Sequence, residues 1–113
     1  MIFIIGPLYS GKRDFACRLL GCGAQELKSR AVWDVQDLAA QCGDLEALAA
    51  RLAEYEVVIA TEVGGGVVPA DPEERSGREA AGRLNCLLAR RAQRVIRVFY
   101  GLPLILKEEQ ESV

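Results

Sequence analysis

An apolar run followed by a glycine-lysine turn opens the chain and limits its fold more than any other stretch. The run MIFII precedes GPLYSGKRD, which spans residues 6–14. Gly6, Gly11 and Lys12 satisfy the G-x-x-x-x-G-K spacing of a phosphate-binding loop. Such a loop joins a buried strand to a helix, and its backbone N–H groups bind phosphate together with the helix N-terminus. A plain strand–turn–helix joint with a solvated lysine is the alternative interpretation.

Arg13 departs from the pattern of a phosphate-binding loop. The residue after the lysine is ordinarily Ser or Thr, whose hydroxyl binds Mg²⁺ between the outer phosphates. A guanidinium cannot bind a cation. Either Arg13 points away and leaves a weak, metal-free loop, or its guanidinium neutralises phosphate charge in place of the ion. Both outcomes argue against Mg²⁺ as a cofactor and against efficient phosphoryl transfer.

Strand and helix patterns alternate along the rest of the chain. This alternation predicts an α/β fold with a mainly parallel sheet of about five strands flanked by helices. We expect one domain over residues 1–107 and a charged tail over residues 108–113. Residues 22–30 are expected to be a link without regular structure, and Asp44 to cap a helix. The expected strands are residues 1–5, 31–35, 57–60, 95–100 and 104–106, and the expected helices are residues 12–20, 45–55 and 73–92. In the last helix, an apolar stripe at helical spacing is formed by Ala81, Leu84, Leu88 and Ala92.

Ligands of parallel sheets bind at the carboxyl ends of the strands. This rule places the glycine-lysine loop, Asp34, residues 61–66 and Gly101 at one edge of the sheet. Asp34 follows a strand, where a carboxylate could hold Mg²⁺ through water or act as a base. An Asp at such a place is also commonly a turn residue or a helix cap.

A second candidate site surrounds the glycines of residues 64–66. Glu62 and Gly64 follow a buried strand, and glycines permit close approach of the backbone to a ligand. Arg75 and Arg78 share one face of the next helix, which suggests an anion site. A solvated surface helix with Glu–Arg pairs is the alternative.

Composition excludes several classes of function. The net charge of −2 gives no general attraction to nucleic acid or to anionic membranes. The chain has no histidine, so no histidine of this chain can serve as acid, base, nucleophile or ligand. The four cysteines are expected to be free and mostly buried. No apolar stretch is long enough to span a membrane and the start lacks a basic signal, so a cytoplasmic location is expected.

Two further stretches carry a family resemblance. Residues 61–85 read TEVGGGVVPADPEERSGREAAGRLN, and residues 101–107 read GLPLILK. They resemble the adenosylcobinamide kinase/adenosylcobinamide-phosphate guanylyltransferase family of cobalamin biosynthesis. That family carries E-V-G, then G-x-V-P, then R-x-x-R-D-x-x-G-x-x-N, and at its end G-[IL]-P-L-x-L-K. Glu79 stands where the family has Asp, and the resemblance covers residues 1 to 107.

The resemblance implies a RecA-like P-loop NTPase fold, reduced in this chain, that assembles into homo-oligomers. It implies ATP or GTP as cofactor and a cobinamide as a further partner. The family loop G-x-x-x-S-G-K-S adds Ser10 to Gly6, Gly11, Lys12 and Arg13 as nucleotide-binding residues. Full-length members carry another strand and helices where this chain has only residues 22–30, and that segment holds the histidine that becomes guanylylated.

Two hypotheses of function follow. In the first, the chain is a kinase or nucleotidyltransferase acting on a cobinamide. Lys12 and Asp34 are then catalytic, while Glu62, Gly64, Arg75 and Arg78 shape the second substrate site. In the second, the chain is a catalytically inactive minimal relative that binds a nucleotide or another anion as an accessory protein. Guanylyl transfer as the family performs it requires the missing histidine under either hypothesis.

Overall fold

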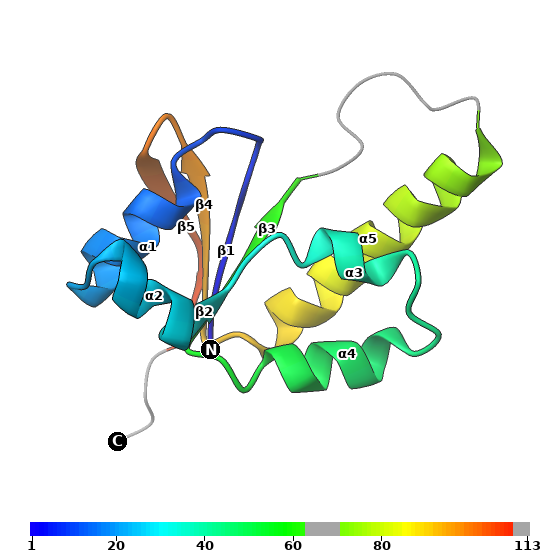
Figure 1. Cartoon of the computed structure of the whole chain (residues 1–113), viewed down its shortest axis with the longest axis horizontal. Helices are drawn as coiled ribbons and strands as arrows, with labels where there is room; N and C mark the ends of the chain where they lie inside the picture. Colours follow the sequence, from blue (N-terminus) through cyan, green and yellow to red (C-terminus); the bar gives the residue numbers. More distant parts are fainter. Residues whose placement is uncertain (63–70, 110–113) are drawn as a thin grey trace.

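The computed structural model describes residues 1–62 and 71–109, and the described part is an α/β fold. Its five-stranded sheet has the order β2-β3-β1-β4-β5, which confirms the predicted mainly parallel sheet (Figure 1). The central strand pairs in parallel with β3 and β4, and only β5 runs antiparallel to its neighbour. The strands are β1 (Ile2–Gly6), β2 (Ala31–Val32), β3 (Val57–Thr61), β4 (Arg94–Phe99) and β5 (Leu102–Glu108).

Helices cover both faces of the sheet, as Figure 1 shows. One face carries α1 and α2, and the other carries α3, α4 and α5. Two separate clusters of buried side chains lie on these two faces. The helices are α1 (Lys12–Leu20), α2 (Ala24–Arg30), α3 (Gln36–Ala39), α4 (Leu45–Leu52) and α5 (Pro72–Arg91).

The apolar run of β1 explains the two-sided core. Side chains of a strand alternate between its faces. Phe3 therefore joins the cluster under α4 and α5, while Ile4 joins the cluster under α1, and both are at most 1% exposed. Because β1 is covered on both faces, it needs apolar residues at consecutive positions, which a half-exposed strand does not.

The long helix α5 packs along the predicted apolar stripe. Ala81, Leu84 and Leu88 are buried against the sheet, as the helical spacing predicted. The far end of the chain then fixes the end of this helix: Lys107 Nζ donates to the backbone oxygens of Ala89 and Arg90 at 3.1 Å each. A cation at this position complements the unpaired carbonyls and the negative end of the helix dipole.

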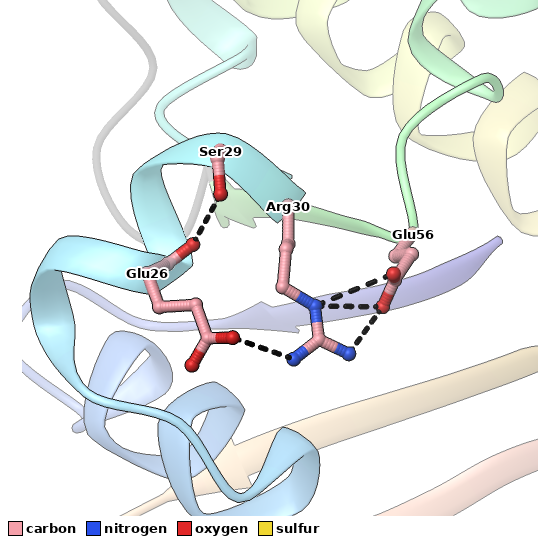
Figure 2. Close-up of polar contacts among 4 residues, drawn as sticks. All are labelled: Glu26, Ser29, Arg30 and Glu56. Carbon is pink, nitrogen blue, oxygen red and sulfur yellow. Dashed lines mark hydrogen bonds and ion pairs between the residues drawn. The ribbon is translucent and has the colours of Figure 1, made fainter.

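The prediction of an irregular link over residues 22–30 was wrong, because most of it is α2. This helix buries one apolar side chain, Leu27, so the sequence shows no helical repeat there. Polar contacts fix its end instead (Figure 2). Arg30 donates to both carboxylate oxygens of Glu56 with its shortest contact at 2.8 Å, and the Glu56 N–H donates to Arg30 O at 3.2 Å. The link is thereby tied to the residue that precedes β3.

Two predicted elements are shorter than expected. The strand predicted over residues 31–35 ends at Val32, because Asp34 takes a left-handed backbone with φ of 58° that no strand accepts. The helix predicted over residues 45–55 ends at Leu52, and Tyr55 is 42% exposed. The predicted Asp44 cap is confirmed, since its Oδ1 accepts the N–H of Ala47 at 3.1 Å.

The edge strand β5 is longer and more exposed than predicted. It runs through Glu108, beyond the expected strand over residues 104–106 and into the expected tail. Four apolar side chains of this strand are at least half exposed: Leu102, Leu104, Ile105 and Leu106. An edge strand also leaves one row of backbone N–H and C=O groups unpaired. This edge therefore combines apolar side chains with free hydrogen-bonding capacity.

Two expectations from composition can be compared with the described residues. All four cysteines are free, as predicted, but three are only partly buried and Cys86 is exposed, so the predicted burial was wrong. Among the helices described here, none combines the length and the apolar character that crossing a membrane requires.

Replacing Leu88 by Ala should destabilise the fold strongly. Leu88 is fully buried, so the substitution leaves a cavity and should lower the free energy of unfolding by about 2–5 kcal/mol. Leu38→Ala is the matched control, because Leu38 is 48% exposed and should cost less than about 1 kcal/mol. Urea denaturation measures both values, and equal losses would contradict the described core.

Candidate functional site

The loop after β1 depends on two glycines for different reasons. A Cβ on Gly6 would stand 2.4 Å from the backbone oxygen of Val98 and 2.8 Å from Ser10 Oγ, so no larger residue fits between β1 and β4. Gly11 has a φ of 86° and occupies the N-cap of α1. A left-handed backbone is costly for residues with a Cβ. The two glycines of the sequence motif therefore mark the two ends of a tight turn. The turn begins at the end of β1 and ends at the N-terminus of α1.

Lys12 is the first residue of α1 and is almost fully buried at 8% exposure. Its Nζ donates to the backbone oxygen of Pro7 at 2.6 Å and lies 3.5 Å from Ser10 Oγ. Burial lowers the pKa of Lys12 more than the nearby carboxylates of Asp34 and Glu62 raise it. The hydrogen bond from Lys12 to Pro7 O thus connects the two ends of the loop. It leaves the ammonium group of Lys12 poorly solvated inside the loop.

Arg13 is exposed and is one of the residues that line the cavity beside the loop. Its guanidinium carbon lies 5.5 Å from the ring centroid of Trp33, in a cation–π contact. The cavity has a volume of about 470 Å³ and is lined by loop residues and by the ends of two strands. The lining residues are Leu8, Tyr9, Ser10, Gly11, Lys12, Arg13, Asp14, Trp33, Asp34, Ile59 and Thr61. Both alternatives stated for Arg13, a side chain that leaves the loop metal-free and one that neutralises phosphate, stay predictions.

Asp34 lines the cavity and follows the end of β2 at Val32. Its left-handed φ of 58° turns the chain out of the sheet. The chain then returns, with the Val35 N–H directed at Ile59 O at 3.5 Å and Gln36 Oε1 accepting the Thr61 N–H at 3.0 Å. Gln36 was not predicted as a site residue. Its side chain accepts the Thr61 N–H only because the fold brings Gln36 beside the end of β3, and the sequence does not show this proximity. The predicted neighbourhood of Lys12 and Asp34 is therefore present.

Glu62 is held by an arginine that the sequence analysis did not identify. Arg97 on β4 forms a two-pronged ion pair with Glu62, in which Arg97 Nη2 donates to Oε2 at 2.7 Å and Nε donates to Oε1. The Arg97 guanidinium also lies over the Phe99 ring, 4.0 Å from its centroid. The ion pair raises the pKa of Arg97. A sequence pattern does not reveal this pair, since the two residues are neighbours only across the sheet.

The second predicted site is not brought to this cavity by the described residues. Arg75 and Arg78 lie in the first half of α5, whose N-terminal end projects away from the sheet (Figure 1), and neither lines the cavity. Gly64 lies outside the described residues. A different groove of about 1160 Å³ between α5 and the α3–α4 segment includes Glu79 and Gly82 of the sequence motif. The joint role of Glu62, Gly64, Arg75 and Arg78 therefore stays a prediction.

The magnesium role predicted for Asp34 stays a prediction. Within residues 1–62 and 71–109, no three Asp, Glu, His or Cys side chains gather closely enough to form a metal site. Mg²⁺ prefers oxygen ligands in an octahedral arrangement. The lining of the cavity combines the cations Lys12 and Arg13 with the carboxylates of Asp14 and Asp34. It also includes the hydroxyl-bearing residues Ser10 and Thr61.

Comparisons with known proteins give one family and no curated relative. The profile of the family described as cobinamide kinase / cobinamide phosphate guanyltransferase matches residues 22–106. The matched range begins after the phosphate-loop motif, so it is independent of Gly6, Gly11 and Lys12. No curated protein matches the chain.

Gly6→Ala should disrupt the loop and destabilise the fold. The added methyl would collide with Val98 O, and the required separation of β1 from β4 should cost about 1–3 kcal/mol or more. Gly43→Ala is the control, because no atom lies within 4 Å of its added Cβ and its φ is not left-handed. Thermal denaturation of both variants tests the close approach, which equal midpoints would refute.

Lys12 should make stability depend on pH in the alkaline range. Its folded pKa lies below the ordinary 10.5, so between these two values the unfolded chain binds more protons than the folded chain. The free energy of unfolding contributed by Lys12 should therefore rise with pH across this window and be constant above it. Urea denaturation from neutral pH to pH 10.5 should show this rise in the wild type relative to Lys12→Met. Parallel pH profiles would contradict it.

Proposed function

The chain belongs to the cobinamide kinase / cobinamide phosphate guanyltransferase family, since the family profile covers residues 22–106, and from this we propose that it binds the phosphates of ATP or GTP in the Gly6–Lys12 loop. We further propose that it does so without a required metal, as a reduced P-loop protein of the RecA-like class. One observation carries this proposal: Lys12 and Arg13 both contribute to one cavity at the N-terminus of α1.

The two cations support phosphate binding in complementary ways. The N-terminus of α1 provides unpaired N–H groups and the positive end of a helix dipole. A polyphosphate would offer Lys12 a better partner than Pro7 O and would restore its lowered pKa. Arg13 presents a planar guanidinium that can donate two parallel hydrogen bonds to phosphate. Trp33 holds this guanidinium at the cavity wall.

Phosphoryl transfer to a cobinamide is a second candidate function. The position of Asp34 in the cavity with Lys12 favours it, because a carboxylate there can accept a proton from an attacking hydroxyl. Arg13 weakens it, because it stands where the loop pattern has a hydroxyl ligand for the cation that normally stabilises the transferring group. Guanylyl transfer through histidine is not available to this chain, which contains none.

The partners predicted from the sequence also remain proposals. A cobinamide is the proposed second ligand, with Glu62, Gly64, Arg75 and Arg78 as its predicted contacts. Association into a homo-oligomer in the cytoplasm is proposed on the family resemblance. We propose the β5 edge as the surface for such association, since it would bury apolar side chains that are exposed on both faces of the strand.

Calorimetric titration of the wild-type chain with GTP and ATP, with magnesium or with EDTA, tests the proposal. We expect affinities in the two conditions to agree within about threefold, since Arg13 rather than a metal neutralises the phosphates. Arg13→Ser should weaken binding in EDTA by about 10-fold or more and create a dependence on magnesium. Arg13→Lys is the control that keeps the charge and loses the two-pronged geometry.

Two outcomes would contradict the proposal. Absence of nucleotide binding by the wild type in both conditions would remove the proposed function altogether. A strong magnesium requirement in the wild type would remove the metal-free arrangement and favour the kinase. Transfer of labelled phosphate from GTP to adenosylcobinamide, compared with Lys12→Ala, decides whether binding leads to chemistry.

A further inference from the structure

Two tyrosines beside the phosphate loop are held in an unusual backbone conformation and packed against almost nothing. Tyr9 and Tyr100 have φ values of 59° and 50°, and their side chains are 94% and 93% exposed. Left-handed backbone is costly for large side chains and is concentrated at functional sites. Together with Asp34 they are the non-glycine residues with positive φ among those that the structure describes.

Backbone contacts bring the two tyrosines to the same place. Gly101, next to Tyr100, donates its N–H to the backbone oxygen of Ser10, next to Tyr9, at 2.8 Å. A Cβ on Gly11 would lie 3.4 Å from Gly101 Cα, so the loop and the β4–β5 turn are in close contact. Arg18 of α1 adds a hydrogen bond from Nη2 to Gly101 O at 3.2 Å. The turn is therefore attached both to the phosphate loop and to the helix that follows it.

Residues on both sides of β1 surround the cavity. Trp33, Asp34 and Thr61 line the cavity from β2 and β3, which lie on one side of β1 in the sheet. Tyr9 lines the cavity as well, and Tyr100, which is outside the lining, follows β4 on the other side of β1. A nucleotide whose outer phosphates face Lys12, Arg13 and Asp34 would extend its base toward the two tyrosines.

We propose that Tyr9 and Tyr100 form a nucleobase subsite that stacks the purine of a nucleotide whose phosphates occupy the loop. This inference rests on the proposed function of the loop. Each ring offers an apolar face, and every nucleobase has a π-face on which such a ring can stack. Stacking alone reads no base edge, so the subsite accepts adenine and guanine alike. ATP and GTP therefore bind this chain with similar affinity.

The subsite is tested by comparing nucleotides with a probe that has phosphates and no base. ATP, GTP and inorganic tripolyphosphate are titrated calorimetrically into the full chain. Tyr100→Ala and Tyr9→Ala should each weaken ATP and GTP by about 10- to 100-fold and leave tripolyphosphate within about twofold. Tyr100→Phe keeps the ring and should keep nucleotide affinity. Tyr55→Ala, at an exposed tyrosine beyond α4, is the matched control.

Backbone strain is separated from stacking by a further variant. Tyr100→Asn removes the ring but suits a left-handed backbone, so it should lose nucleotide affinity while the thermal midpoint of unfolding is kept. Equal weakening of nucleotides and tripolyphosphate, or no change in any variant, would overturn the subsite. A wild-type chain that binds tripolyphosphate as tightly as ATP would overturn it as well and leave the loop's function standing. A chain that binds neither probe would overturn both.

Discussion

The central strand β1 is the element on which the rest of the structure depends. It pairs in parallel on both sides, and its side chains enter both cores. Its last residue, Gly6, permits β4 to approach so closely that the following loop begins between two strand ends. Its Gly6 carbonyl also accepts the N–H of Glu62 at 2.8 Å, which fixes the end of β3 beside the loop. The cavity is therefore built on the most constrained part of the sheet.

The anion site proposed for the loop is organised around side-chain cations. In a metal-dependent site, the ion carries most of the positive charge and leaves with the product. Here Lys12 and Arg13 are part of the chain, and their charge is present before any ligand arrives. Lys12 is buried and poorly solvated, whereas Arg13 is exposed and in contact with the Trp33 ring.

Local signals were sufficient for much of the fold. The apolar stripe of α5, the Asp44 cap and the apolar run of the buried strand β1 each depend on neighbours in the sequence, and these elements were predicted closely. The α2 helix was missed because it buries only Leu27 and is fixed by Arg30 to a residue far along the chain. The early end of β2 was missed because the backbone angle of Asp34 leaves no trace in the sequence pattern. In the site, the loop was predictable, whereas the Arg13–Trp33 and Arg97–Glu62 contacts need the folded sheet to bring their partners together.

The narrow gap at Gly6 also determines how the β4–β5 turn can behave. Loops that cover nucleotide sites commonly swing on hinges, and their closure adds a slow step to binding. This turn emerges from a strand that lies against Gly6, and it is bonded to Ser10 and Arg18. These bonds hold the turn against the loop and against α1. A nucleotide bound in the loop as proposed would meet the turn already in contact with the loop, so that its binding would need no closing step.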